Sequence, residues 1–218
     1  MSDARPPQQR PYPGYDVLAG RDSPSWNDAT RRVVDARLRL PSRAPRFFDA
    51  AAYATLGAVA ARIVPSPADA PVPVAALLDA KLADGPGDGF RDHRLPAAGQ
   101  AWRIGLAALE AMARAAHGSA FAALDGAAAD ALLRRVQQGE VAADAGADAG
   151  ADWHGMDPAV FFAKRVLADL SGAYYSHPAA WSEIGFGGPA SPRGYVRMGF
   201  NRRDPWEAPL RERNDDTN

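Results

Sequence analysis

The sequence of 218 residues contains no cysteine. This absence excludes disulfide bonds, iron–sulfur clusters ligated by this chain, thiolate zinc sites and cysteine nucleophiles. An excess of charge of either sign is also missing, because 25 Lys and Arg stand against 26 Asp and Glu, with a formal net charge of −1. A chain of this kind has no overall field that attracts nucleic acid or anionic lipid. We therefore expect no nucleic acid among its partners.

A recognisable targeting or membrane-spanning segment is missing as well. Residues 1–20 are polar and proline-rich, unlike a signal peptide, and we expect them to form a flexible segment. The pair Arg31-Arg32 precedes an apolar run from Ala50 to Val64, an order of parts that twin-arginine export signals share. Charged residues and prolines separate the pair from the run, and the run is too short to span a bilayer. We interpret the run as a buried helix and expect no direct membrane insertion.

The middle of the chain shows the spacing of apolar residues that is typical of helices. Phe48, Ala52, Leu56, Val59 and Ile63 form one continuous stripe of this kind. The same reasoning predicts helices over residues 26–40, 46–63, 72–83, 97–117, 126–138 and 158–171. No alternation of apolar and polar residues is long enough to predict a sheet. The sequence therefore predicts an all-α fold, a single compact helical domain of about six helices over residues 21–171.

Two further segments have compositions that do not support a packed helix. Residues 140–151 are acidic and rich in alanine and glycine, with too little apolar bulk to pack, and we expect a mobile loop. Residues 172–210 combine aromatic residues, arginine, glycine and proline with few long aliphatic side chains. We expect this segment to be a long, irregular and extended carboxyl-terminal arm, followed by a disordered tail over residues 211–218.

The residues that usually carry chemistry do not gather into a motif. The four histidines lie in different segments, and Asp152, His154 and Asp157 lack a fourth partner for a zinc site. The stretch Gly185–Ala190 matches the glycine spacing of a dinucleotide-binding loop. Prolines within this stretch and just after it exclude the helix that such a loop must open. We therefore predict no catalytic, cofactor-binding or metal-binding residue in this chain.

The arm over residues 172–210 has the composition of a segment that lies across another surface. Trp, Tyr and Arg are favoured at the energetic centres of protein interfaces, and proline lowers the entropy lost on ordering. Neighbouring glycines permit close approach of a partner's backbone. The alternative, an arm that folds back over its own helices, stays open. The candidate partner-binding residues in the arm are Trp181, Phe186, Gly187, Gly188, Arg193, Tyr195, Arg197, Arg202, Arg203 and Trp206.

Phe161 is a further candidate outside the arm. On a regular helical wheel it lies among Lys164, Arg165 and Asp169, away from the apolar stripe of its helix. An aromatic residue in such a position either belongs to a helix that is buried on two sides or contacts a partner. Both interpretations stay open, and we include Phe161 among the partner-binding candidates.

The arm resembles the carboxyl-terminal signature of the gluconate 2-dehydrogenase subunit 3 family. The specific part is the stretch Glu183–Arg197, read together with Asn201-Arg-Arg-Asp-Pro-Trp206. Other segments fit the same resemblance, namely Gly14–Ala19, Asp22–Trp26, Thr30–Val34 and the helix from Phe47 to Pro65. The likeness extends from Tyr12 to Glu207, which is nearly the whole chain.

This resemblance implies a non-catalytic small subunit, an accessory protein rather than an enzyme. Members of the family accompany a large flavoprotein of the glucose–methanol–choline (GMC) type, which holds FAD and oxidises a sugar, polyol or sugar acid. A cytochrome c subunit often completes the complex. The resemblance further implies that the small subunit supports folding, stability or export of the flavoprotein and holds no cofactor of its own.

The chain departs from many members of the family at its amino terminus. Those members begin with a twin-arginine export signal, and residues 1–20 contain none. We expect a cytoplasmic protein, with co-export to the periplasm alongside a partner as the alternative. Two other functions also stay open: an independent helical domain that binds or converts a small molecule, and a scaffold unrelated to flavin chemistry.

Overall fold

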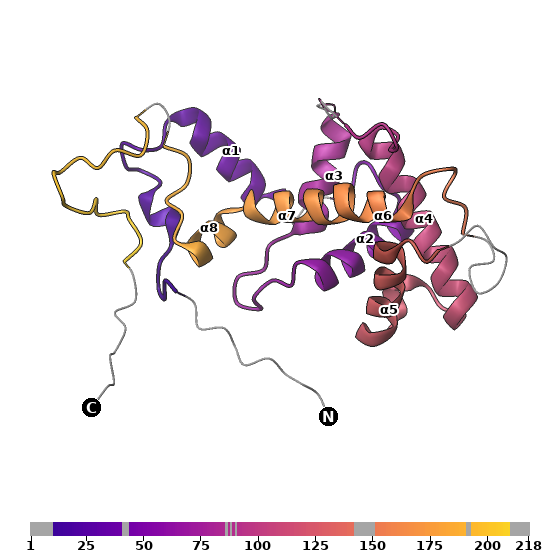
Figure 1. The fold of residues 1–218 in the computed structure, drawn as a ribbon. Coiled ribbons are helices and arrows are strands. Elements are labelled where there is room, and N and C mark those ends of the chain that lie inside the picture. The colour runs from indigo at the N-terminus through magenta and orange to yellow at the C-terminus, as the bar shows by residue number, and fades with distance from the viewer. Residues whose placement is uncertain are drawn as a thin grey trace, which may run out of the picture. The chain divides into compact units, whose positions relative to one another are not determined.

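The computed structural model describes residues 11–40, 44–85, 87, 89, 91–141, 151–190 and 193–209. The regular secondary structure of these residues is helical throughout (Figure 1). An isolated β-bridge pairs Gly199 with Arg202. The predicted all-α fold is confirmed.

The chain divides into two compact units. Unit 1 joins Met1–Arg39 to Tyr175–Asn218, and unit 2 consists of Leu40–Tyr174. The sequence predicted one compact domain over residues 21–171 with an arm outside it. The structure differs, because Trp26 from the first segment packs against Trp181 from the last and the two chain ends form a unit together.

Unit 2 is built around one long helix. Its elements are α2 (Ala50–Ile63), α3 (Val74–Asp84), α4 (Ala98–His117), α5 (Gly126–Gln138), α6 (Pro158–Phe161), a π-helix (Phe162–Leu167) and most of α7 (Ala168–Tyr175). α4 contacts α2, α5 and α6, and its Trp102, Leu106 and Met112 are fully buried. The alanines that separate these large residues let the neighbouring helices approach α4 closely.

Helix ends in unit 2 follow the capping residues of the sequence. Carboxylate oxygens of Asp49, Asp125 and Asp157 each accept a hydrogen bond from the backbone amide three residues later, at 2.8, 2.8 and 3.1 Å. These bonds satisfy amides that have no partner inside the helix. Gly139, with φ of 69°, ends α5 in the left-handed conformation that glycine adopts without steric cost.

The π-helix explains the position of Phe161. An α-helix has 3.6 residues per turn, so residues five apart lie on different faces, whereas the i→i+5 hydrogen bonds of a π-helix bring them to one side. Phe161 and Val166 are accordingly both fully buried. The Phe161 ring meets Trp102 edge to face at 5.5 Å between centroids and lies 5.8 Å from Trp153. Its assignment to a partner surface is corrected, because a side chain without exposed area cannot contact a second protein.

Two buried carboxylates join distant segments of unit 2. Asp79 of α3 accepts hydrogen bonds from the backbone amides of residues 46, 47 and 48, at 2.7, 3.0 and 3.0 Å. Asp169 of α7 accepts from the Trp102 indole at 2.9 Å and from the Lys81 ammonium at 3.0 Å. Asp79 therefore joins α3 to the segment before α2, and Asp169 joins α7 to α3 and α4.

The predicted disordered regions fall largely outside the described residues. These are residues 1–10, the greater part of the predicted loop over 140–151, and the predicted tail over 211–218. Residues 11–20 are described, and the structure corrects the predicted flexible segment there. Val17 is buried and opens the 3₁₀-helix Val17–Gly20, which begins with a hydrogen bond from the Leu18 amide to the Asp16 carboxylate.

Candidate partner-binding site

Unit 1 has a small core to which both ends of the chain contribute. Its helices are the 3₁₀-helix Val17–Gly20, α1 (Asp28–Leu38) and α8 (Pro178–Ile184). Trp26 and Trp181 meet edge to face in this core, with ring centroids 6.3 Å apart, and Val17 and Val34 complete the buried cluster. Trp181 is therefore a core residue. Its assignment to a partner surface is corrected, because its own chain already covers the indole.

The first part of the predicted arm is helical rather than extended. α7 continues to Tyr175 and α8 follows after two residues. The Trp181 indole N–H donates a hydrogen bond to the Tyr175 carbonyl at 2.6 Å, and the Ser182 hydroxyl accepts one from the Val17 amide at 3.1 Å. These bonds fix α8 on the core of unit 1. The irregular part of the arm begins at Gly185, where α8 ends.

His177 makes the stability of unit 1 sensitive to pH. Its ring is buried before α8, and Nδ1 accepts the hydrogen bond of a helix amide. Burial, together with the charge of Arg37, lowers the pKa of His177 below its ordinary value of about 6.5. The unfolded chain thus binds a proton more readily than the folded one, so the stability present above pH ~6.5 is lost as the pH falls below it.

Substitution of His177 by asparagine is expected to remove this pH dependence. Asparagine keeps an oxygen that can cap α8 but does not titrate. The measurement is the urea midpoint of the full chain between about pH 8 and pH 5, followed by near-ultraviolet circular dichroism. A variant with the same slope as the wild type between pH 6.5 and 5 contradicts the assignment to His177.

The paired glycines of the arm permit a close approach to their own chain. The Gly187 carbonyl accepts a hydrogen bond from the Trp26 indole at 3.2 Å. A Cβ atom at Gly188 would lie 2.6 Å from the Trp26 ring, and Gly188 has a φ of 77°. The surface approached here is the indole of Trp26, and the approach of a partner's backbone stays a prediction.

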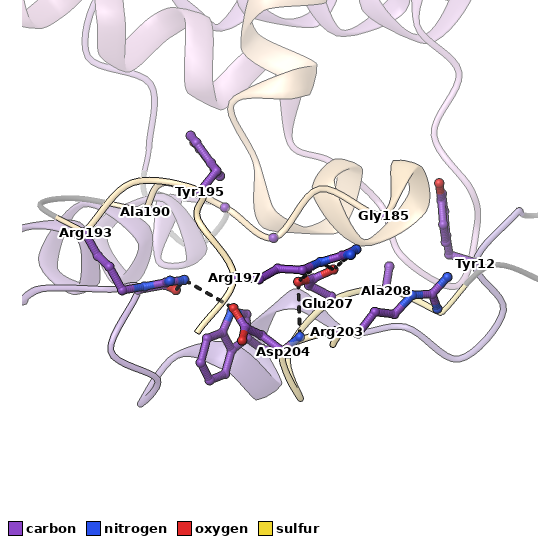
Figure 2. Close-up of a pocket in the computed structure, with 14 residues that line it drawn as sticks. Tyr12, Gly185, Ala190, Arg193, Tyr195, Arg197, Arg203, Asp204, Glu207 and Ala208 are labelled. Atoms are coloured by element: carbon purple, nitrogen blue, oxygen red, sulfur yellow. Dashed lines mark hydrogen bonds and ion pairs between the residues drawn. The ribbon is translucent and has the colours of Figure 1, made fainter. Parts of the chain in front are cut away.

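Two predicted arginines form ion pairs within the arm (Figure 2). Arg197 donates to both carboxylate oxygens of Glu207 at 2.8–3.0 Å, and these bonds hold the pKa of Glu207 below its ordinary value. Arg193 donates to the Ser25 hydroxyl at 2.8 Å and lies 3.6 Å from the buried carboxylate of Asp204. These pairs border a cavity of about 390 Å³ in unit 1.

Trp206 fastens the end of the arm to the amino-terminal segment. Its carbonyl accepts a hydrogen bond from the Tyr15 hydroxyl at 3.0 Å. Its Cβ lies 3.2 Å from the position that a Cβ would take at Gly20, so an alanine there would require Trp206 to shift by a few tenths of an ångström. The Arg193 guanidinium stands over the indole, 5.5 Å from the ring centroid. Trp206 thus has a role inside unit 1, whether or not a partner also contacts it.

Residues 195–200, which we call the 195–200 loop, project apolar side chains into solvent. The exposed fractions are 71% for Tyr195, 75% for Val196, 65% for Met198 and 94% for Phe200. Beside the loop, the side chains of Arg202 and Arg203 are exposed and make no hydrogen bond or salt bridge within the described part of the chain. The loop is therefore the part of the arm that is available to a second molecule.

The sequence predicted some of these residues and missed others. Tyr195, Arg202 and Arg203 were candidates and are exposed, whereas Phe186 is partly buried with its ring 5.8 Å from Trp181. Val196, Met198 and Phe200 were missed. Their apolar side chains at every second position between Gly194 and Asn201 are the signal that could have found them.

The described residues contain no group of three or more His, Asp or Glu side chains that could hold a metal ion. None of the described helices has the length and apolar character needed to cross a membrane.

The family of the chain follows from its sequence. Residues 50–188 match the sequence model of the family described as Gluconate 2-dehydrogenase subunit 3. No curated protein and no solved structure gave a significant match. The matched region is well over half of the 218 residues and contains α2 to α8, but it ends before the ion pairs of the arm and the 195–200 loop. The chain therefore belongs to the gluconate 2-dehydrogenase subunit 3 family.

Proposed function

We propose that this chain is the non-catalytic accessory subunit of a flavin-dependent sugar, polyol or sugar-acid dehydrogenase. Its partner is a large GMC-type flavoprotein that holds FAD, with a cytochrome c subunit as a further member of the complex. The observation that carries the proposal is membership in a family of subunits of gluconate 2-dehydrogenase. The chain supports the folding, stability or export of the flavoprotein and holds no cofactor of its own.

The structure of unit 1 supports a role in binding a protein. The base of the arm is tied to its own chain by the Arg193 and Arg197 ion pairs, while the 195–200 loop leaves large apolar side chains uncovered. Exposed apolar clusters of this kind are typical of surfaces that bind another protein. An accessory subunit needs such a surface.

Co-expression with the flavoprotein tests the proposed function. We expect the tagged chain to elute together with the flavoprotein and with the visible absorption bands of oxidised flavin. Omission of this chain should lower the soluble yield or the FAD content of the flavoprotein. An unrelated FAD oxidoreductase expressed with the same tagged chain serves as the control. A flavoprotein that is equally soluble, flavin-loaded and active alone, and that does not bind this chain, would contradict the proposal.

The compartment is a separate part of the proposal. We place the complex in the cytoplasm, with the periplasm, reached by co-export on a partner's signal, as the alternative. Fractionation of the native host followed by immunodetection of this chain distinguishes the two. A signal in the periplasmic fraction that disappears when the partner's export signal is removed would establish co-export.

A further inference from the structure

We propose that the 195–200 loop is the docking element of this chain and that it enters an apolar pocket, rimmed by carboxylates, on the flavoprotein subunit. The inference rests on the proposed function, because it names the surface through which the accessory subunit holds its partner. Three observations support it: the apolar side chains of the loop are exposed, hydrogen bonds fix the backbone of the loop, and arginines lie beside it.

The apolar side chains of the 195–200 loop are more exposed than the large apolar side chains of the other described residues. Large apolar side chains elsewhere in those residues reach at most 53% exposure, at Tyr175. All four apolar side chains of the loop exceed this value, and Phe200 reaches 94%. Contiguous apolar side chains in water are unfavourable, and clustered exposure of this kind marks a surface that a partner covers.

The backbone of the loop is fixed although its side chains are free. Arg197 points back to Glu207, the Met198 amide donates to the Asp204 carboxylate at 2.9 Å, and Arg193 donates to the Val196 carbonyl. The Arg197 side chain is held by Glu207, whereas the side chains of Val196, Met198 and Phe200 stay exposed. Binding therefore orders little new backbone, which lowers its entropic cost.

The charges beside the loop indicate the chemistry of the partner. The Arg193 and Arg197 guanidinium groups are paired with Asp204 and Glu207, whereas the exposed side chains of Arg202 and Arg203 form no salt bridge within the described residues. Arg203 contributes only at longer range, where its charge helps to lower the pKa of Glu207. A partner surface with carboxylates around an apolar pocket complements this arrangement. A second copy of the chain does not, because a two-fold interface would bring the same arginines face to face.

Binding of full-length variants to the purified flavoprotein tests the inference. The double substitution Met198→Ser and Phe200→Ser is expected to raise the Kd by about 100-fold, because it removes two apolar anchors. Arg202→Glu with Arg203→Glu is expected to slow association and to invert its salt dependence. Val33→Ser is the matched control, since Val33 is an exposed apolar residue on α1, 50% exposed, and should change the Kd less than about threefold.

The outcomes separate the inference from the proposed function. If the wild-type chain does not bind the flavoprotein, the proposed function fails. If it binds and the Met198/Phe200 variant binds equally well, with unchanged circular dichroism, only the inference is overturned. A wild-type dimer that this variant converts to a monomer would assign the loop to a second copy. Loop-dependent sedimentation of the chain with phosphatidylserine vesicles, without loop-dependent flavoprotein binding, would assign it to a lipid surface and also overturn the inference.

Discussion

Replacement of Asp79 by alanine is expected to lower the free energy of unfolding of unit 2 by about 3–5 kcal/mol. Asp79 is 3% exposed and accepts three backbone hydrogen bonds from residues 46–48, the segment that leads into α2. Hydrogen bonds to a charged acceptor contribute about 1.5–3 kcal/mol each, and their amides lose their acceptor when the carboxylate is removed. Urea unfolding followed by far-ultraviolet circular dichroism gives the loss as a shift of the midpoint.

Two matched variants show whether the carboxylate is the cause. Asp79→Asn keeps one acceptor oxygen and replaces the other by a donor, so we expect roughly half of the loss. Asp49→Ala removes an exposed cap of α2 that accepts one amide, for which about 1 kcal/mol is expected. If Asp79→Ala loses less free energy of unfolding than Asp49→Ala, water replaces the Asp79 carboxylate.

Replacement of Phe161 by alanine is expected to cost about 3–5 kcal/mol, the usual range for removing a buried aromatic side chain. The Phe161 ring lies between Trp102 and Trp153 and directly over Gly105 of α4. Its loss leaves a cavity that the rigid indole rings cannot close. The same variant distinguishes a core role from a partner role. Unchanged stability together with weaker flavoprotein binding would restore the partner interpretation.

Gly105 provides a second measurement of the same contact. A Cβ at position 105 would overlap the Phe161 ring, so Gly105→Ala in the wild type is expected to destabilise unit 2 by about 1–3 kcal/mol. In the Phe161→Ala protein the space is empty, and the higher helix propensity of alanine should make the same change stabilising by up to about 1 kcal/mol. Absence of this change of sign would mean that the two positions are not in contact.

The helices were predictable because their signals are local. Asp125 and Gly139 mark the two ends of α5 within the sequence itself, and the stripe that includes Leu56 and Val59 predicts the buried face of α2. Such signals need only a few neighbouring residues. The division into two units was not predictable in this way, because Trp26 and the arm residue Gly187, which it contacts, are separated by 161 residues.

Periodicity did not predict the burial of Phe161, and composition did not predict which residues of the arm are buried. A helical wheel assumes 3.6 residues per turn throughout, and the π-helix after Phe161 breaks that assumption at the position in question. Composition shows that the arm is rich in Trp, Tyr and Arg, the residue types favoured at interfaces. It could not tell which of them face inward, since Trp181 and Phe200 are both aromatic residues of one segment but lie at opposite extremes of burial.

The construction of unit 1 from both chain ends has a consequence for biosynthesis. Unit 2 is one continuous stretch, so all of its residues are synthesised before the carboxyl-terminal segment of unit 1. The Trp26 and Tyr15 contacts to Gly187 and Trp206, by contrast, wait for the last part of the chain. The contacts that hold the 195–200 loop therefore form only after Glu207 has been made, and chains that terminate before it lack them.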